Sequence, residues 1–174
     1  MRRPADRYVE SPNQDQRPAG TEITLLVVHS ISLPPGEYGG DSIERLFTNR
    51  LDPGAHPFFR EIAGLKVSSH FLIRRDGEAV QFVAPERRAW HAGASGWRGR
   101  GVCNDFSVGV ELEGLEGSVF AARQYARLAR LIAQLRKKLP LRAIAAHSDV
   151  APGRKTDPGA RFDWPRLLGA LAKR

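Results

Sequence analysis

One stretch near the end of the chain concentrates side chains that could do chemistry. Residues 146–159 follow an apolar run, 141–145, that predicts a short buried strand. Their Pro and Gly residues predict a loop, and loops beyond rigid strand ends are where α/β proteins place chemistry. We hypothesise that His147 and Asp157 bind a metal and that Lys155 faces a substrate. Under the alternative, the acidic residues only shape turns and His147 is a core histidine with satisfied hydrogen bonds.

A second histidine occupies a comparable position much earlier in the chain. Residues 23–28 are β-branched or apolar, predict a central strand buried on both faces, and end at His29. If the two strands are neighbours, His29 and His147 emerge at one edge of the sheet, where Asp157 could supply a third ligand. Two imidazoles and a carboxylate with an open position are a catalytic zinc arrangement, which would polarise a carbonyl and lower the pKa of bound water. The same set also suits non-haem Fe(II).

Two further apolar patterns predict the rest of the sheet. Residues 67–73 and 79–83 flank an Asp-Gly pair, which is the strongest short-range signal for a β-hairpin. Residues 106–112 predict another strand, which places Glu111 near its end. A glutamate at a strand end is more often solvated than catalytic, so this pattern alone leaves the role of Glu111 open.

The spacing of apolar residues predicts helices beside this sheet. An amphipathic helix spans about 121–139, and shorter helices follow the capping residues Asp41 and Asp163. Residues 50–65 predict an irregular stretch, and residues 93–104 predict a long Gly-rich loop without structure of its own. The predicted fold class is α/β (α+β), with a central mixed β-sheet, a β-hairpin and flanking helices.

Length and charge bound the domain organisation and the partners. The 174 residues suffice for one domain, which we expect at 21–174 after an extended, polar N-terminal arm at 1–20. The net charge of +8 favours an anionic partner. Nucleic acid and small polycarboxylates both suit that charge, but Lys and Arg are scattered without an aromatic-interleaved basic motif. We therefore expect a small anionic substrate and no nucleic acid.

The cysteine content and the apolar runs bear on location. Cys103 is the single cysteine, so no intrachain disulfide can form, which fits a reducing compartment. The longest strongly apolar run, 25–28, is too short to span a bilayer, and no apolar stretch follows Met1-Arg2-Arg3 as a secretion signal would require. We expect a cytoplasmic protein without a membrane partner, and a structural thiol at Cys103.

Several separate motifs resemble one known family and come in that family's order. They are Val28-His29-Ser30-Ile31-Ser32-Leu33-Pro34-Pro35-Gly36, Leu72-Ile73-Arg74-Arg75-Asp76-Gly77, Trp90-His91-Ala92-Gly93, Cys103-Asn104-Asp105-Phe106-Ser107, Gly109-Val110-Glu111-Leu112-Glu113-Gly114 and the stretch from His147 to Gly159. Over about residues 25–164 the chain resembles the AmpD-type amidases, which are cytosolic zinc N-acetylmuramoyl-L-alanine amidases of the peptidoglycan-recognition fold.

This resemblance implies a zinc hydrolase, and we expect the protein to be a monomer. It makes His29, His147 and Asp157 the ligands of one Zn²⁺, and Glu111 and Lys155 the catalytic residues. The implied reaction cleaves the amide between 1,6-anhydro-N-acetylmuramic acid and L-Ala of the stem peptide during cell-wall recycling. By removing anhydromuropeptides, such an enzyme indirectly influences β-lactamase induction.

The substrate contacts are less well defined by the resemblance. Ser30 stands where the family suggests Asn, and Val102 stands where relatives often carry an Arg suited to a stem-peptide carboxylate. Lys66, Arg98 or Arg100 could compensate for that Arg. We expect a cleft walled by 31–40 and 93–104. Trp90 is either core filler or a wall for the sugar, and His91 either lines the cleft or packs. The candidate substrate-binding residues are Ser30, Lys66, Trp90, His91 and Arg100.

Two other classes of function compete with the amidase. Proteins of this fold that have lost zinc bind peptidoglycan fragments without cutting them, but the intact set of proposed ligands and catalytic residues argues against that alternative. A nucleic-acid binder would use the positive charge and show a strongly salt-dependent affinity, but no recognition motif supports it.

Overall fold

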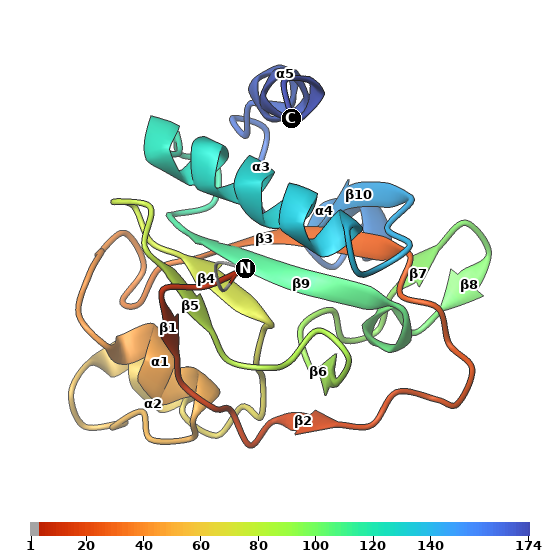
Figure 1. The fold of residues 1–174 in the computed structure, drawn as a ribbon. Helices are drawn as coiled ribbons and strands as arrows, with labels where there is room; N and C mark the ends of the chain where they lie inside the picture. The colour runs from red at the N-terminus through yellow and green to blue at the C-terminus, as the bar shows by residue number, and fades with distance from the viewer. Residues whose placement is uncertain (1–3) are drawn as a thin grey trace.

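The computed structural model describes residues 4–174, which fold around a six-stranded sheet (Figure 1). The strands stand in the order β1-β5-β4-β9-β3-β10. Their bounds are Arg7–Tyr8 for β1, Ala79–Gln81 for β5, Phe71–Ile73 for β4, Ser107–Glu113 for β9, Leu25–Ile31 for β3 and Ala143–Ala146 for β10. The β4–β5 pair is the predicted hairpin and is antiparallel, whereas the other pairs of this sheet are parallel. The predicted α/β (α+β) class with a mixed sheet is confirmed.

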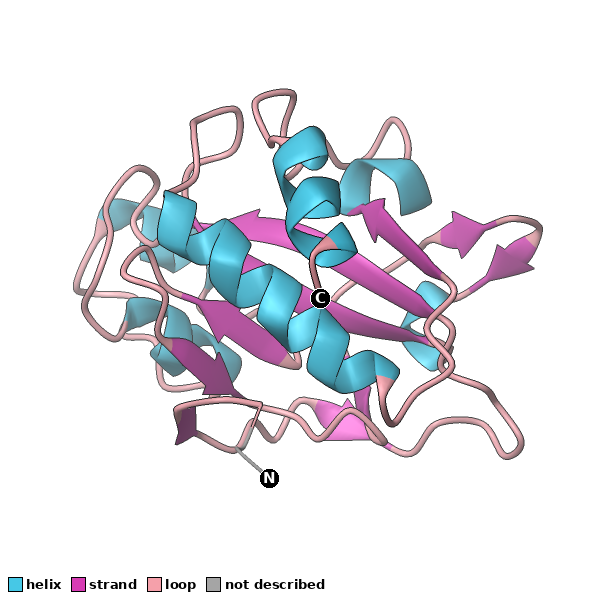
Figure 2. Cartoon of the chain, turned by 45° about the horizontal axis from the view of Figure 1, so that its top comes forward, coloured by secondary structure: helices cyan, strands magenta, loops and turns pink. Residues whose placement is uncertain are grey.

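Helices cover both faces of this sheet (Figure 2). The helices are α1 at Ser42–Phe47, α2 at Pro57–Ile62, α3 at Ala122–Arg136, α4 at His147–Val150 and α5 at Trp164–Ala172, with a 3₁₀ turn at Cys103–Asp105. Helix α3 lies across one face with α5 packed on it, while α1 and α2 lie on the opposite side near β4 and β5. No helix within the described residues combines the length and the apolar character needed to cross a membrane.

Side-chain alternation along the strands decides which residues face the functional site. In β3, Leu26 and Val28 join the core beneath α3, whereas Val27 joins the core on the opposite face. Because successive strand residues point to opposite faces, His29 shares the face of Val27. Glu111 lies opposite His29 in the parallel β3–β9 register and points the same way. The sheet therefore directs both side chains to the face away from α3.

Three segments carry structure that the sequence pattern did not predict. The expected irregular stretch 50–65 contains α2, whose N-terminus is capped by the side chain of His56 and begins with Pro57. The expected unstructured loop 93–104 contains the paired strands β7 (Gly96–Trp97) and β8 (Arg100–Gly101). The stretch after β10 begins with the short helix α4 rather than a loop. Each of these elements has six residues or fewer, too short to produce an apolar periodicity.

The N-terminal segment lies in extended form against the rest of the chain. Strand β1 adds to the sheet edge beside β5, and β2 (Gln14–Asp15) pairs antiparallel with β6 (Arg88–Ala89). The guanidinium of Arg88 also contacts both carboxylate oxygens of Asp15 at 2.6 Å. The arm is thus attached at two places, and the boundary at residue 20 stays a prediction.

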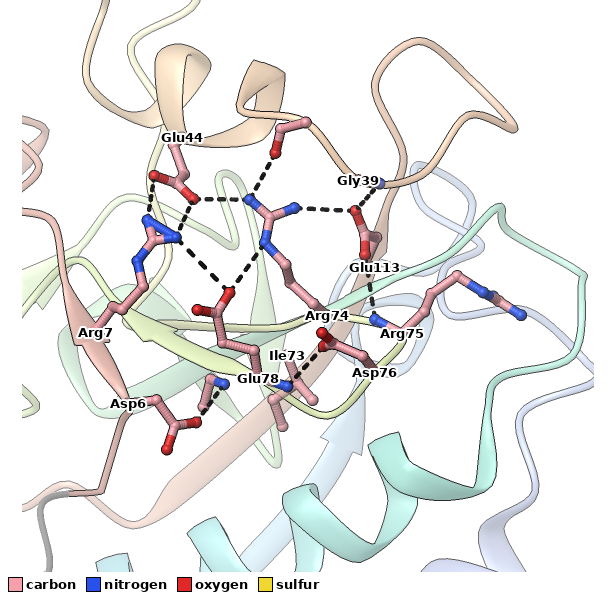
Figure 3. Close-up of polar contacts among 12 residues, drawn as sticks. Asp6, Arg7, Gly39, Glu44, Ile73, Arg74, Arg75, Asp76, Glu78 and Glu113 are labelled. Carbon is pink, nitrogen blue, oxygen red and sulfur yellow. Dashed lines mark hydrogen bonds and ion pairs between the residues drawn. The ribbon is translucent and has the colours of Figure 1, made fainter.

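A buried ionic network holds the loop after β3 and the start of α1 to the ends of β4 and β9 (Figure 3). The guanidinium of Arg74 donates to Glu113 at 3.1 Å, to Glu44 at 2.7 Å and to the Gly40 carbonyl at 2.8 Å. The backbone N–H of Gly39 donates to the same Glu113 carboxylate at 2.7 Å. Arg74 and Glu113 are both buried, so neither charge can be satisfied by water instead.

Removing Arg74 should therefore destabilise the fold strongly. Arg74→Met leaves the buried Glu113 carboxylate without its cation, and breaking a buried pair in this way costs about 3–5 kcal/mol. Arg142→Met is the matched control, because Arg142 pairs with Glu22 where both side chains are largely exposed; its cost should stay within about 1 kcal/mol. Urea unfolding measures both free energies. Equal, small losses would show that the network does not anchor this loop.

Candidate metal centre and active site

Three side chains from distant parts of the chain meet at one edge of the sheet. β3 lies between β9 and β10 and runs parallel to both, with Ala146 opposite Val28 in the β3–β10 register. The carboxyl ends of these strands therefore meet, and the next residues, His29 and His147, come together. Asp157 returns to them from the following loop, whose backbone carbonyl at Asp157 accepts from the N–H of Ser148 at 3.1 Å. The predicted juxtaposition of the three residues is present.

The ligand atoms lie within a few tenths of an ångström of the separations that a tetrahedral metal requires. The Nδ1 atoms of His29 and His147 are 2.9 Å apart, His147 Nδ1 is 3.0 Å from Asp157 Oδ1, and His29 Nδ1 is 3.4 Å from Asp157 Oδ2. Two ligands bound at about 2.0–2.2 Å to a tetrahedral zinc lie about 3.3–3.6 Å apart. All three residues are buried. The group could therefore hold one metal ion with modest side-chain adjustment.

The electrostatic environment suits metal ligands. Burial lowers the pKa of His29 to about 4, against the opposing effect of the Asp157 carboxylate, so its imidazole is neutral and has a lone pair to give. Burial opposes ionisation of Asp157, but its close contacts with His147 and His29 outweigh that effect and hold its pKa below the usual range. Two imidazoles and an ionised carboxylate are thus ready for a cation.

Glu111 stands beside these groups in the same cleft. It is buried, and its Oε2 has no hydrogen-bond partner among the described residues. Burial raises its pKa well above the usual value, with the negative charge of Asp157 adding to the effect and Lys155 opposing it. A buried, unpaired carboxyl with a raised pKa is suited to general acid–base work. The structure therefore excludes the alternative in which Glu111 is an ordinary solvated residue at the end of a strand.

The surrounding cleft differs from the one we expected. It holds the metal-ligand group, Glu111 and Lys155, and one wall is apolar. That wall contains Leu46, Phe47, Leu65 and Val67. Of the expected walls, 31–40 contributes Ile31, and 93–104 contributes none of the described lining residues, so the prediction about the second wall was wrong. The short β7–β8 pair folds that segment on itself, and α1 contributes Leu46 and Phe47 to the lining.

Arg154, which the sequence analysis did not single out, holds two segments of the site together. The guanidinium of Arg154 donates to the backbone carbonyl of Ala92 and, at 2.7 Å, to that of Ala94. The same Ala92 carbonyl lies 3.3 Å from Nε2 of His147. Arg154 therefore ties the segment after Trp90 to the loop that carries Lys155. Only the folded structure brings these parts together, and no spacing in the sequence indicates the contact.

Comparison with known proteins identifies the family. Residues 19–160 match the family described as N-acetylmuramoyl-L-alanine amidase. The chain belongs to this family. The prediction of an N-acetylmuramoyl-L-alanine amidase, made from the order of the motifs, is confirmed.

The amidase is similar to proteins that carry a more specific name. It is 53% identical over 169 residues to the 1,6-anhydro-N-acetylmuramyl-L-alanine amidase AmpD of Escherichia coli (strain K12), covering 96% of this chain and 92% of that protein. A crystal structure of a selenomethionine AmpD derivative superposes with a TM-score of 0.93 at 48% identity, over 98% of this chain and 96% of that one. The amidase AmiD of E. coli, in complex with anhydro-N-acetylmuramic acid-L-Ala-D-γ-Glu-L-Lys, gives a TM-score of 0.63 at 26% identity, over 89% and 60%.

The substrate-binding residues predicted for this amidase fall into two groups. Ser30, Trp90 and His91 line the cleft, and the Ser30 hydroxyl has no partner within the described chain. Lys66 and Arg100 are not among the described lining residues. The Arg100 guanidinium instead stacks 3.9 Å from the ring centroid of Phe106. A role for either cation in substrate binding stays a prediction.

A glycine behind the site gives a test of how tightly this amidase packs there. A Cβ added at Gly109 in β9 would lie 2.5 Å from the ring of His91, whereas one added at Gly169 in α5 would meet nothing within 4 Å. Gly109→Ala should therefore destabilise the protein by about 1–3 kcal/mol through overpacking. Gly169→Ala should stabilise it by about 0.5–1 kcal/mol, because Gly is unfavourable inside a helix. Chemical unfolding of both variants measures the change in the free energy of unfolding, which should have opposite signs in the two. A Gly109→Ala variant as stable as wild type would contradict the tight packing against His91.

Proposed function

We propose that this amidase uses one Zn²⁺ to hydrolyse the amide between 1,6-anhydro-N-acetylmuramic acid and L-Ala of the stem peptide. One observation carries the proposal: a buried His-His-Asp group lies in a cleft beside an unpaired buried glutamate. The AmpD name of relatives that align along almost the whole chain supports the anhydromuramyl substrate. AmiD, in complex with an anhydromuropeptide, supports the class of ligand for the shared fold.

The donor set supports zinc over harder cations. Two imidazole nitrogens and one carboxylate leave a fourth position free, which is the arrangement of catalytic zinc sites, whereas Mg²⁺ and Ca²⁺ prefer oxygen ligands. His29 and His147 would supply the nitrogens and Asp157 the oxygen. Zinc bound there supplies a Lewis acid that polarises the scissile carbonyl and lowers the pKa of a bound water.

Glu111 would move the proton that the hydrolysis requires. Its carboxylate takes a proton from the attacking water as the new C–O bond forms. The resulting carboxylic acid then gives that proton to the nitrogen of L-Ala as the C–N bond breaks. The position opposite His29 in the β3–β9 register puts the carboxyl next to the metal ligands without making it one of them. Because Oε2 of Glu111 has no hydrogen-bond partner among residues 4–174, no competing bond at that atom must break first.

Lys155 would stabilise the negative charge that develops on the carbonyl oxygen. It lies on the cleft, is exposed, and stands two residues before Asp157. Its positive charge already acts within the site, since it lowers the pKa of Glu111 against the effect of burial. A cation held near the reacting carbonyl contributes to transition-state binding more than to ground-state binding.

This amidase would act in cell-wall recycling, inside the cell. The single cysteine supports a reducing, cytoplasmic location. A monomer without nucleic-acid or membrane partners is part of the same proposal, as is an indirect influence on β-lactamase induction through removal of anhydromuropeptides.

Metal removal and replacement test the proposed reaction. Protein freed of metal by a chelator should leave an anhydromuropeptide intact, and adding back about one equivalent of zinc per chain should restore release of the free stem peptide. Mass spectrometry follows both products, because cleavage adds one water across a single amide. Full turnover by metal-free protein would refute the zinc mechanism, whereas zinc binding without cleavage would indicate a binding module.

Substitution of Glu111 should separate chemistry from metal binding. Glu111→Gln keeps the shape of the side chain but removes the base, so turnover should fall about 10²–10⁴-fold while zinc content stays the same. Single-turnover kinetics and elemental analysis of one preparation measure both. If turnover survives, the base lies elsewhere in the cleft.

Substitution of Lys155 should lower kcat rather than raise KM. Loss of one oxyanion stabiliser costs about 10²–10³-fold in kcat, so Lys155→Ala should show a loss on that scale with zinc still bound. Lys138→Ala, which removes an exposed lysine remote from the cleft lining, should be close to wild type. Steady-state kinetics distinguish the two, and a Lys155→Ala enzyme with unchanged kcat would remove this residue from the mechanism.

A further inference from the structure

A line of buried hydrogen bonds runs from the metal-ligand group into the core. Nε2 of His29, the nitrogen that faces away from His147 and Asp157, lies 2.9 Å from Nδ1 of His91. Nε2 of His91 lies 3.0 Å from the hydroxyl of Ser107. That hydroxyl lies 2.6 Å from the backbone carbonyl of Cys103. Each of these residues is buried, so water does not substitute for the contacts.

The carbonyl at the far end fixes the direction of every bond in this line. A carbonyl oxygen only accepts, so the Ser107 hydroxyl donates to Cys103. The oxygen of Ser107 is then left to accept from Nε2 of His91, which makes Nδ1 of His91 an acceptor. His29 must in turn carry its proton on Nε2 and donate it to His91. The lone pair of His29 is therefore on Nδ1, the atom that faces His147 and Asp157.

We propose that His91 is a positioning residue that fixes the tautomer and the ring orientation of His29, with Ser107 fixing His91 in turn. This inference rests on the proposed zinc site, because the benefit of a fixed tautomer is a lone pair aimed at the metal. A ligand histidine whose other nitrogen donates to a fixed acceptor binds metal more tightly, and loss of such a partner typically costs about 10–100-fold in affinity.

The surrounding backbone holds the ring of His91 in place. The N–H groups of His91 and Ala92 both donate to the side-chain oxygen of Asn104, at 3.2 Å and 2.8 Å. The ring itself lies against β9 at Gly109, where the absence of a Cβ leaves it room. The position of the His91 ring and the nitrogen that carries its proton are therefore both fixed before any metal binds.

This assignment differs from a role for His91 in substrate binding. Both ring nitrogens already have protein partners, at His29 and Ser107, so neither is free for a substrate group. His91 does belong to the cleft lining, but only 9% of the residue is exposed, so little of its surface can meet a substrate. The two roles predict different losses when the residue is changed.

A pair of variants of nearly equal size tests the assignment. His91→Asn places an amide oxygen close to the position of Nδ1 and keeps the acceptor for His29, whereas His91→Leu has a similar shape and no acceptor. Competition with a zinc chelator should show an affinity loss of about 10–100-fold for His91→Leu, and a clearly smaller loss for His91→Asn. The KM of each variant, measured with saturating zinc, should stay close to wild type.

A third variant covers the case in which changes at His91 disturb folding. Ser107→Ala keeps the ring and removes its far partner, so zinc affinity should fall by about 2–10-fold, the equivalent of one hydrogen bond. Circular dichroism of the metal-free proteins confirms that each variant is folded.

Three results would overturn the inference. Equal zinc affinities for His91→Asn, His91→Leu and wild type would leave the ring without a positioning role. A raised KM with unchanged zinc affinity would make His91 a substrate-binding residue. If wild-type protein binds no zinc at all, the proposed function fails, and this inference fails with it. That outcome is seen in the wild-type protein alone, so it is distinct from a failure of the His91 assignment, which is seen only between variants.

Discussion

The parallel pairing of β3 with both β9 and β10 is the constraint on which the site depends. It brings the carboxyl ends of three strands to one edge, and strand alternation then turns His29 and Glu111 to the same face. A shift of one residue in the β3–β9 register would send these two side chains to opposite faces of the sheet. The apolar contacts under α3 fix that register, so the hydrophobic core positions the chemistry although it contains none of it.

Burying the two carboxyl groups of the site costs free energy, and a bound cation would offset that cost. Contacts with His147 and His29 hold Asp157 ionised, while burial and the charge of Asp157 both resist ionisation of Glu111. A divalent ion between the ligands would favour the charged form of both carboxyls. The hydrogen bonds behind His29 account for the orientation of one ligand, and the contacts of Arg154 account for the placement of the loop that carries Asp157.

The sequence predicted the parts that follow from local pattern. Apolar runs located β3 and β10, the Asp-Gly turn located the β4–β5 hairpin, and the order of the motifs indicated the family. Contacts between residues distant in sequence were not predictable in this way. His91 was assigned to the substrate because nothing in its neighbourhood reveals that Ser107 and His29 flank its ring. The presence of Leu46 and Phe47 in the cleft lining depends on how α1 packs, which no periodicity of so short a helix could show.

X-ray absorption at the zinc edge tests the central claim most directly, because it reports the atoms bound to the metal. The zinc-loaded protein should show two imidazole nitrogens and oxygen donors, all at about 2.0–2.2 Å in a four-coordinate shell. Sulfur at about 2.3 Å would assign the metal to Cys103, the single cysteine of the chain. A shell with sulfur, or one with no imidazole, would contradict the account of a zinc amidase built on His29, His147 and Asp157.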